Sequence, residues 1–256
     1  MLAPMTRRAL VTGATSGIGL AFAKELAKRG HDLVIVARTT DRLETVAREI
    51  RDRHGVEVDV VTADLSTDAG MQLTANALTD SARPVDLLVN NAGASLAGWF
   101  GTTAIADEDR QLDLLVRAPM HLMDAAIKTM AGRGGGKIIN VSSVAAFTPR
   151  GVYSAHKAWL LNLSRWADVH YDDVNIAVQA LCPGFVRTEF HQRGEMDVSG
   201  IPRWMWLKAD KVVTASLKDL AHDRPVSIPS VRYQTLAFLA RHLPAGLVAR
   251  AAKRGR

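Results

Sequence analysis

The sequence has one cysteine, few aromatic residues and no long hydrophobic run. Cys182 is the only cysteine among 256 residues, which excludes an intramolecular disulfide and a cysteine-based zinc site. The apolar runs, such as residues 32–37, are far too short to cross a bilayer. The N-terminal stretch lacks the apolar core and small-residue cleavage site of a secretory leader. We therefore expect a soluble protein of the reducing cytoplasm.

Acidic residues are fewer than basic ones, with 26 Asp and Glu against 32 Lys and Arg. The formal net charge is +6 and the sequence pI is about 9.7, values that raise the possibility of nucleic-acid binding. The basic residues are spread along the chain, with a single dense cluster at residues 250–256. Scatter of this kind is typical of a solvated surface, and a positive field also attracts phosphorylated small molecules. We therefore expect no nucleic-acid partner.

Short runs rich in Val, Ile and Leu alternate with longer segments of helical periodicity. The expected strands are residues 8–12, 32–37, 56–62, 85–90, 136–142 and 175–181. Between them lie helices such as residues 17–30, ending at Gly30, and residues 41–55, where Asp41 and Glu44 have capping-box spacing. Strands with few polar residues are buried on both faces, and strand–helix–strand repetition gives a parallel sheet. The pattern predicts a single doubly wound α/β domain with helices on both faces.

A glycine-rich turn, TGATSGIG at residues 12–19, follows the first expected strand and opens a helix. Gly13 allows a sharp turn, and Gly17 and Gly19 allow the backbone to approach a pyrophosphate closely. Free N–H groups at the start of the helix would bind the phosphates. A spaced glycine triplet alone is equally explained by a tight turn, but the strand–turn–helix context favours a dinucleotide site. We therefore expect a Rossmann-type fold.

The end of the second strand bears on the choice of cofactor. An acidic residue there would bind the ribose 2′-hydroxyl of NAD, but this chain has Ala37 followed by Arg38 and Thr39. A 2′-phosphate could contact the Arg38 guanidinium and the Thr39 hydroxyl. The alternative is that Arg38 is a solvent-facing loop residue. We expect NADPH in preference to NADH.

Tyr153 and Lys157 are four residues apart in the helix-like stretch VYSAHKA, so they share one face. A free phenol has a pKa of about 10, and a nearby ammonium would lower that pKa towards working pH. Tyr153 would then act as general acid in ketone reduction or as general base in alcohol oxidation. Ser143, after the fifth strand, could donate a hydrogen bond to the substrate oxygen. A Y-x-x-x-K pair alone is common on helix surfaces, but its combination with the glycine turn is specific.

Together these motifs resemble the short-chain dehydrogenase/reductase family over residues 8 to about 188, in the family's order. The matching stretches are TGATSGIG (12–19), ADL (63–65), NNAG (90–93), NVSS…YSAHK and PGFVRT (183–188). The resemblance implies hydride transfer between nicotinamide and a carbonyl carbon, without a metal, with Ser143, Tyr153 and Lys157 as catalytic residues. Lys157 would also hold the nicotinamide ribose. With Asn90 expected beside them, the expected cofactor-binding residues are Gly13, Thr15, Ser16, Gly17, Ile18, Gly19, Arg38, Thr39, Asp64, Leu65, Asn91, Ala92, Gly93, Tyr153, Lys157, Pro183, Gly184, Val186 and Thr188.

One departure from the family's pattern concerns proton supply. Leu115 stands where most members carry an asparagine that holds a water in a relay to the lysine. Backbone carbonyls alone hold that water, or turnover is reduced, or the aligned position is off by a helical turn. A non-catalytic NADPH-binding sensor of the same fold is therefore the alternative to an enzyme.

Two further departures lie close to the tyrosine. The span from Ser143 to Tyr153 is about three residues shorter than in most members of the family, which leaves the choice between Ser142 and Ser143 ambiguous. Strand alternation places the two serines on opposite faces, and Ser143 occupies the second-serine position of the motif. His156 points about 100° away from Lys157 round the helix, which favours packing or a subunit contact over catalysis.

The C-terminal third carries the expected substrate and subunit contacts. Residues 188–225 occupy the family's substrate-lid region and contain Phe190, Met196, Ile201, Trp204, Met205 and Trp206. These side chains could simply pack a helix on the sheet, but beside a cofactor cleft they suggest an apolar ketone or a β-ketoacyl substrate. The helical segment 233–256 could contact another subunit or an anionic membrane. We expect subunit packing in a homodimer or homotetramer, without membrane association.

Overall fold

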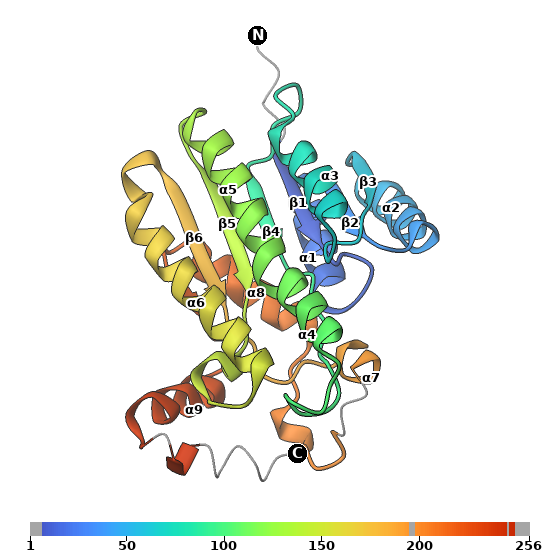
Figure 1. The fold of residues 1–256 in the computed structure, drawn as a ribbon. Helices are drawn as coiled ribbons and strands as arrows, with labels where there is room; N and C mark the ends of the chain where they lie inside the picture. The colour runs from blue at the N-terminus through green and yellow to red at the C-terminus, as the bar shows by residue number, and fades with distance from the viewer. Residues whose placement is uncertain (1–6, 195–197, 245, 249–256) are drawn as a thin grey trace.

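A computed structural model of the protein, which describes residues 7–194, 198–244 and 246–248, contains one seven-stranded parallel sheet (Figure 1). The strand order is β3-β2-β1-β4-β5-β6-β7. The strands are β1 (Arg8–Thr12), β2 (Asp32–Ala37), β3 (Val58–Thr62), β4 (Leu87–Asn90), β5 (Gly136–Val141), β6 (Ile176–Leu181) and β7 (Val226–Ser227). The order reverses between β1 and β4, and ligands of open α/β sheets bind at the carboxyl ends of such strands.

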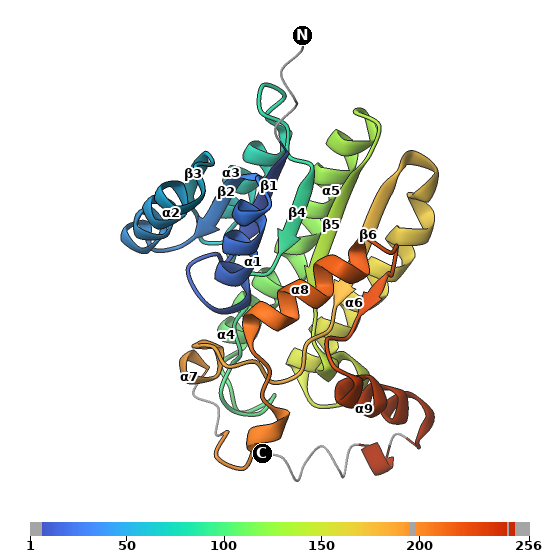
Figure 2. The ribbon, with the colours of Figure 1, turned by 180° about the vertical axis from the view of Figure 1, so that it is seen from behind.

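Helices cover both faces of the sheet (Figures 1 and 2). On one face lie α1 (Gly17–Lys28), α2 (Thr40–His54) and α8 (Ala209–Leu220). On the other lie α3 (Asp68–Thr79), α5 (Ala118–Ala131) and α6 (Val152–His170). Successive strand residues supply both layers: Leu33 and Ile35 pack with α1, whereas Val34 and Val36 pack with α3 and α5. The all-apolar strands are therefore buried on both faces, and the predicted fold is confirmed.

The limits of the elements differ slightly from those predicted. β3 and β4 begin two residues later than expected, and the two-residue strand β7 was not predicted. Gly30 follows α1 with a φ of +80°, as a helix-ending glycine should. α2 starts at Thr40 with Thr39 as its N-cap, so Asp41 lies inside the first turn. The predicted capping box is therefore wrong.

Shorter elements gather where the strands end. They are α4 (Ile105–Leu112), the π-helix η1 (Asp113–Arg117), the 3₁₀-helices η2 (Val144–Phe147), η3 (Asp172–Val174) and η4 (Arg203–Met205), and the helices α7 (Phe190–Arg193) and α9 (Val231–His242). The predicted lid region 188–225 is too long, because α8 buries Val212, Val213 and Leu217 in the core against α1. Only the part before α8, with α7 and η4, lies at the carboxyl edge of the sheet (Figure 1).

Tyr233 connects α9 to two segments at this edge. Its hydroxyl donates to the Met205 carbonyl at 2.8 Å and accepts from the Phe185 N–H at 3.0 Å. Gly184 lies flat against the ring, because a Cβ added there would be 2.0 Å from Cζ of Tyr233. The sequence contained no sign of this contact, since 49 residues separate Gly184 from Tyr233.

We expect Tyr233→Phe to destabilise the fold. It leaves the Phe185 N–H and the Met205 carbonyl without their partner, a loss of about 1–3 kcal/mol for buried groups. Tyr171→Phe is the matched control, and urea unfolding of both variants measures the effect. Equal midpoints for the two variants would show that the Tyr233 hydroxyl has no structural role.

Candidate active site

The glycine turn between β1 and α1 has the shape that a pyrophosphate requires. Gly13 and Gly17 have φ values of +66° and +57°, which side chains rarely adopt. A Cβ on Gly19 would lie 2.3 Å from the Gly13 carbonyl oxygen, so no larger residue fits there. Thr15 and Ile18 complete the turn and are half-buried. The backbone itself is therefore the surface that a ligand would meet.

The start of α1 is open to an anion. Ser16 is its N-cap, but the serine side chain makes no capping hydrogen bond, and the first turn contains no acidic residue. The first-turn N–H groups and the positive end of the helix thus remain available to phosphate. Thr188 borders the same turn, with its methyl group 3.0 Å from the position of a Cβ on Gly17. The structure brings the predicted pyrophosphate turn and the nicotinamide-side motif together.

Thr12 joins this turn to the segment after β4. Its hydroxyl accepts from the N–H groups of Asn91 and Ala92, both at 2.9 Å. The Asn91 side-chain amide donates to the Thr12 carbonyl at 2.8 Å. Thr12 was not among the predicted residues, although a threonine that ends a strand before a glycine turn could have drawn attention. The hydrogen bonds between Thr12 and Asn91 hold Ala92 and Gly93 beside the glycine turn.

Arg38 and Thr39 are exposed at the carboxyl end of β2. Burial acts to raise the pKa of Asp64, but hydrogen bonds from the Ser66 N–H and hydroxyl and the charge of Arg38 hold that pKa below its usual value. Arg38 therefore lies close enough to influence Asp64, and both predicted residues border the same end of the sheet. Leu65 is buried, so its side chain packs inside the protein.

The PGFVRT segment runs from β6 back towards the glycine turn. The Pro183 carbonyl accepts from the Val144 N–H at 3.0 Å, and Val186 is buried and pairs with Leu207 in an isolated parallel bridge. The Thr188 hydroxyl accepts from the Phe190 N–H at 3.3 Å. The Phe185 carbonyl and the Arg187 N–H also pair with Leu207, so the backbone of this segment is fixed between β6 and the glycine turn.

The two serines after β5 have different surroundings. Ser142 is buried and donates to the Lys157 carbonyl at 2.8 Å. Ser143 hydrogen-bonds to the Tyr153 hydroxyl, and its oxygen also accepts from the Ala145 N–H at 3.1 Å. Because the hydrogen bond with Ser143 lowers the pKa of the phenol, the serine hydroxyl acts as its donor and Tyr153 as the acceptor. Of the two, Ser143 is the one beside Tyr153.

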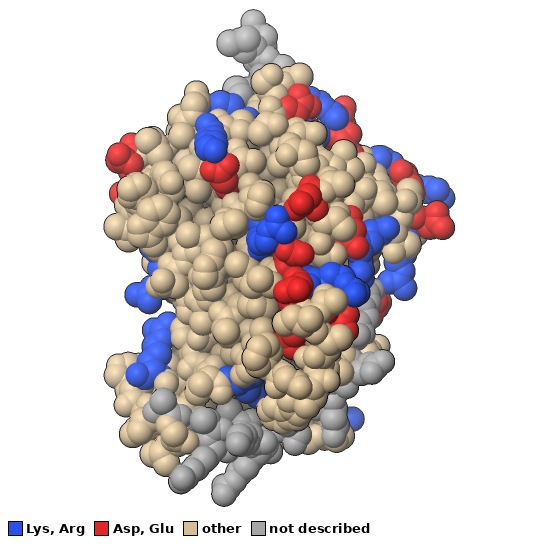
Figure 3. Space-filling model, viewed as in Figure 1, with Lys and Arg blue, Asp and Glu red and all other residues tan. Residues whose placement is uncertain are grey.

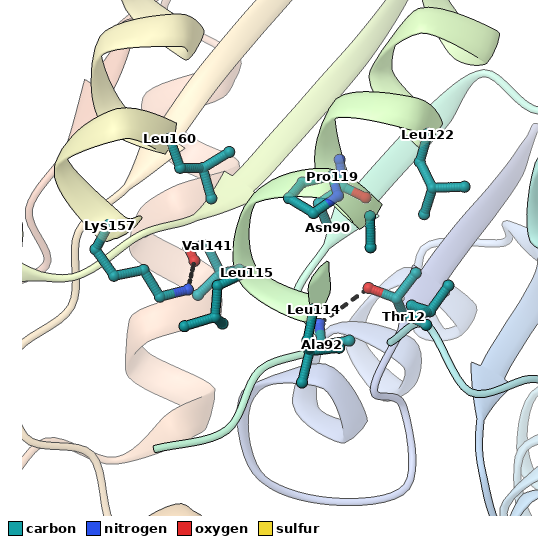
Figure 4. Close-up of a pocket in the computed structure, with 12 residues that line it drawn as sticks. Thr12, Asn90, Ala92, Leu114, Leu115, Pro119, Leu122, Val141, Lys157 and Leu160 are labelled. Carbon is teal, nitrogen blue, oxygen red and sulfur yellow. Dashed lines mark hydrogen bonds between the residues drawn. The ribbon is translucent and has the colours of Figure 1, made fainter. Parts of the chain in front are cut away.

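Tyr153 and Lys157 project from the first two turns of α6 towards the same side. The Lys157 ammonium nitrogen lies 5.8 Å from the centroid of the Tyr153 ring. It donates to the Val141 carbonyl at the end of β5, at 2.7 Å (Figure 4). Burial lowers the pKa of Lys157 to about 8. The predicted catalytic residues are thus brought together at the carboxyl end of β5.

The predicted effect of Lys157 on the phenol is wrong for this structure. Burial raises the pKa of Tyr153 to about 12, and the hydrogen bond with Ser143 lowers it only in part. The amine points to the Val141 carbonyl, and burial lowers its own pKa to about 8. Desolvation of the phenolate therefore outweighs attraction to the ammonium. Tyr153 is protonated at neutral pH.

Leu115, which replaces the asparagine of the family's pattern, lines a cavity next to Lys157 (Figure 4). Leu115 lies in the π-helix η1, and its side chain is beside the Lys157 amine. Asn90 lines the cavity too, but its amide donates to Asn140 at 2.9 Å, within the protein interior. Asn90 therefore has a structural contact that the family resemblance did not suggest. π-helical turns occur frequently at functional sites.

His156 is buried on α6, in keeping with a packing role. Burial lowers the pKa of its imidazole, and the Glu108 carboxylate on α4 partly offsets that effect. The imidazole therefore lies close enough to Glu108 to be influenced by its charge.

Aromatic side chains form one wall beside Tyr153. The Phe190 ring centroid lies 6.1 Å from that of Tyr153, and His191 packs between Phe185 and Trp206. Of the predicted apolar lid residues, Ile201 and Met205 are half-buried, Trp204 is exposed, and Met196 lies outside the described residues. A cleft bordered in this way favours an apolar ligand.

Known proteins with the same features are numerous. The family model for short chain dehydrogenases matches residues 7–198. A very-long-chain 3-oxoacyl-CoA reductase of Anas platyrhynchos is 34% identical over 71% of this chain and 60% of its own length. A short-chain dehydrogenase from Sphingobium yanoikuyae in complex with NADPH is 34% identical, with a TM-score of 0.84 over 90% of this chain and 92% of that one.

A further solved structure is the bulky-bulky ketone specific alcohol dehydrogenase from Comamonas testosteroni. It is 30% identical, with a TM-score of 0.81 over 95% of this chain and 94% of that chain. The sequence motifs, the strand order and these matches agree. The chain belongs to the short-chain dehydrogenase family of oxidoreductases.

Proposed function

We propose that the protein is an NADPH-dependent carbonyl reductase acting on an apolar ketone or β-ketoacyl compound. The observation that carries this proposal is the hydrogen bond between Ser143 and a protonated Tyr153, beside Lys157 and across from the glycine turn. A bound NADPH would supply a hydride to the carbonyl carbon. The residues must then provide a proton, hold the oxygen and exclude water.

Tyr153 is the proton donor in this proposal. Its phenol O–H bond breaks as a new O–H bond forms on the carbonyl oxygen, which turns the ketone into an alcohol. In the complex, the Ser143 hydroxyl would donate to the same substrate oxygen, where negative charge develops. A phenol of raised pKa holds its proton at neutral pH, which suits reduction. Oxidation of a secondary alcohol uses the same groups in reverse.

Lys157 has two parts in the proposal. Its amine is held at the end of β5, 5.8 Å from the centroid of the Tyr153 ring, where it could hold the nicotinamide ribose and act on the phenol. The residues that would hold the rest of the cofactor are the glycine turn, Asn91 to Gly93, and the segment from Pro183 to Thr188. Arg38 and Thr39 would receive the 2′-phosphate, a preference that the NADPH-bound Sphingobium relative supports.

The substrate class follows from the wall of the cleft. Phe190 offers aromatic surface next to Tyr153, and Trp206 extends this surface through His191, with the Arg187 guanidinium 5.8 Å from the centroid of the Trp206 ring. One relative is named a very-long-chain 3-oxoacyl-CoA reductase and another a bulky-bulky ketone specific alcohol dehydrogenase. Both names support an apolar carbonyl substrate for this protein. A ligand buried against these rings gains free energy with each methylene it adds.

A non-catalytic NADPH sensor is the alternative function. The observation that favours it is Leu115, an apolar side chain beside the Lys157 amine where the family places a relay asparagine. Such a protein would bind NADPH and depend little on Tyr153.

Tyr153→Phe separates the enzyme from the sensor. The enzyme should lose turnover of NADPH with a ketone by about 10²- to 10⁴-fold, the usual share of a general acid. Its Kd for NADPH, measured by cofactor fluorescence, should change little. Tyr171→Phe is the control and should keep full turnover. Unchanged turnover or unchanged cellular function in Tyr153→Phe would contradict the proposed role of the phenol.

Arg38→Asp tests the cofactor preference. The substitution replaces a cation by a carboxylate that repels the 2′-phosphate, so KM for NADPH should rise by about 10- to 100-fold. KM for NADH should stay the same or fall. Arg48→Asp makes the same charge change on the exposed face of α2 and should leave both values unaltered. If both variants shift KM for NADPH equally, Arg38 has no specific contact.

A series of ketones of increasing chain length tests the substrate class. Each buried methylene contributes about 0.8 kcal/mol, so kcat/KM should rise by up to about fourfold per carbon until the cleft is filled. Trp206→Ala should flatten this dependence, whereas Trp166→Ala on the exposed part of α6 should not. Comparable kcat/KM for short and long ketones would refute an apolar site.

A further inference from the structure

Arg42 makes an ion pair that crosses the expected cofactor site. It lies in the first turn of α2, three residues after Thr39, and its guanidinium nitrogen is 3.4 Å from a Glu189 carboxylate oxygen. The two residues are 147 positions apart in the sequence. Glu189 directly follows Thr188, whose methyl group lies 3.0 Å from the position of a Cβ on Gly17. The Arg42 side chain therefore reaches from the start of α2 to the segment that borders the glycine turn.

Both ribbon views place the two partners at the edge of the sheet where a dinucleotide would bind. α2 and α7 lie on the same side of the molecule, and α7 is at the carboxyl edge (Figures 1 and 2). Glu189 is the N-cap of α7, and Arg42 is at the end of α2 that follows β2. In a Rossmann-type fold the ribose 2′-position is read at the end of the second strand. Arg42 is one helical turn beyond Arg38 and Thr39, the residues proposed to receive the 2′-phosphate.

The contact between Arg42 and Glu189 is weak enough to be exchanged for another. The Arg42 side chain is 55% exposed and that of Glu189 is 49% exposed. Water screens an ion pair of this kind, and such pairs contribute little to stability. A phosphate monoester carries a charge of about −1.5 to −2 at pH 7 and can accept two hydrogen bonds from one guanidinium. A 2′-phosphate would therefore compete successfully with Glu189 for Arg42.

Arg38 is itself close to a carboxylate, so its charge is partly offset. The charge of Arg38 lowers the pKa of Asp64, which shows that the two groups influence each other. The first turn of α2 also contains Asp41, which repels an anion. Basic and acidic side chains lie side by side over the right of the face in Figure 3, where α2 lies. Firm binding of a 2′-phosphate here needs a second cation, and Arg42 is the basic residue in that first turn.

We infer that Arg42 is a second cation that binds the 2′-phosphate of NADPH, and that Glu189 holds it in the free protein. When NADPH binds, the guanidinium would leave the Glu189 carboxylate for the 2′-phosphate. NADH has an uncharged hydroxyl at that position and would leave the ion pair unbroken. Glu189 thus lowers the preference for NADPH that Arg42 creates. The inference rests on the proposed cofactor preference and names the pair of residues that sets its size.

The ratio of the Kd for NADH to the Kd for NADPH measures this preference, and cofactor fluorescence gives both values without turnover. Arg42→Gln should lower the ratio by about tenfold, the usual loss for a hydrogen bond to a charged group. Glu189→Gln should raise the ratio by up to about fivefold, the most that an exposed ion pair opposes. The ratio cancels any general repulsion between Glu189 and the pyrophosphate, because both cofactors share that group.

The double variant Arg42→Gln/Glu189→Gln tests the exchange itself. Without the Arg42 guanidinium, the Glu189 carboxylate has no cation to withhold, so the ratio should equal that of Arg42→Gln alone. If Glu189→Gln instead raises the ratio by the same factor with and without Arg42, the two side chains act separately. That result would overturn the inference.

Lys24 and Glu49 form the matched control pair. Their contact joins α1 to α2 at the same distance, 3.4 Å, with side chains 41% and 57% exposed. Glu49 lies about 14 Å along α2 from the start of the helix. Lys24→Gln and Glu49→Gln should therefore leave the ratio unchanged. An equal fall in the ratio for Lys24→Gln and Arg42→Gln would assign the preference to general surface charge and overturn the inference.

Two further outcomes separate the inference from its rivals. If Arg42→Gln and Glu189→Gln weaken NADPH and NADH equally, the ion pair closes over the bound dinucleotide and Arg42 does not bind the 2′-phosphate, which overturns the inference. If Arg42→Gln leaves the ratio unchanged while Arg38→Asp lowers it, the inference fails but the proposed cofactor preference stands.

Discussion

The arrangement of the site depends on Lys157 and on two hydrogen bonds that this residue makes, one through its buried amine and one through its backbone carbonyl. The amine donates to the Val141 carbonyl, and the Lys157 carbonyl accepts from Ser142, so α6 and β5 are joined in both directions. These contacts fix the rotation of α6 about its axis. Tyr153 lies one turn earlier and is thereby held over Ser143. A rotation by one residue, about 100°, would point the phenol away from the cleft.

The same burial sets the protonation states of the site. Removing water disfavours the charged form of every group, so it lowers the pKa of Lys157 and raises that of Tyr153 together. The protein thus holds a neutral phenol beside an ammonium of lowered pKa, a state prepared to give a proton. The Phe190 ring, with its centroid 6.1 Å from that of Tyr153, contributes apolar surface to this environment. Proton donation and the proposed substrate class follow from the same edge of the sheet.

The sequence predicted the fold well because its signals are local. Four successive apolar residues from Leu33 to Val36 require a strand covered on both faces, and the glycine turn requires a helix after it. The sign of the Tyr153 pKa shift was not predictable, since it depends on burial depth, which spacing along a helix does not encode. The contact of Gly184 with Tyr233 was also hidden, because only the folded chain brings α9 to that glycine. The two-residue β7 is too short to give a periodic signal.

The central claim is that Tyr153 is a half-buried, protonated phenol in the free protein, and its titration tests that claim most directly. The alkaline difference spectrum of tyrosinate, taken as the unchanged protein minus Tyr153→Phe, isolates this residue from Tyr171 and Tyr233. The account predicts a pKa of about 12. A pKa at or below the ordinary value of about 10 would contradict it, because attraction to Lys157 would then outweigh burial.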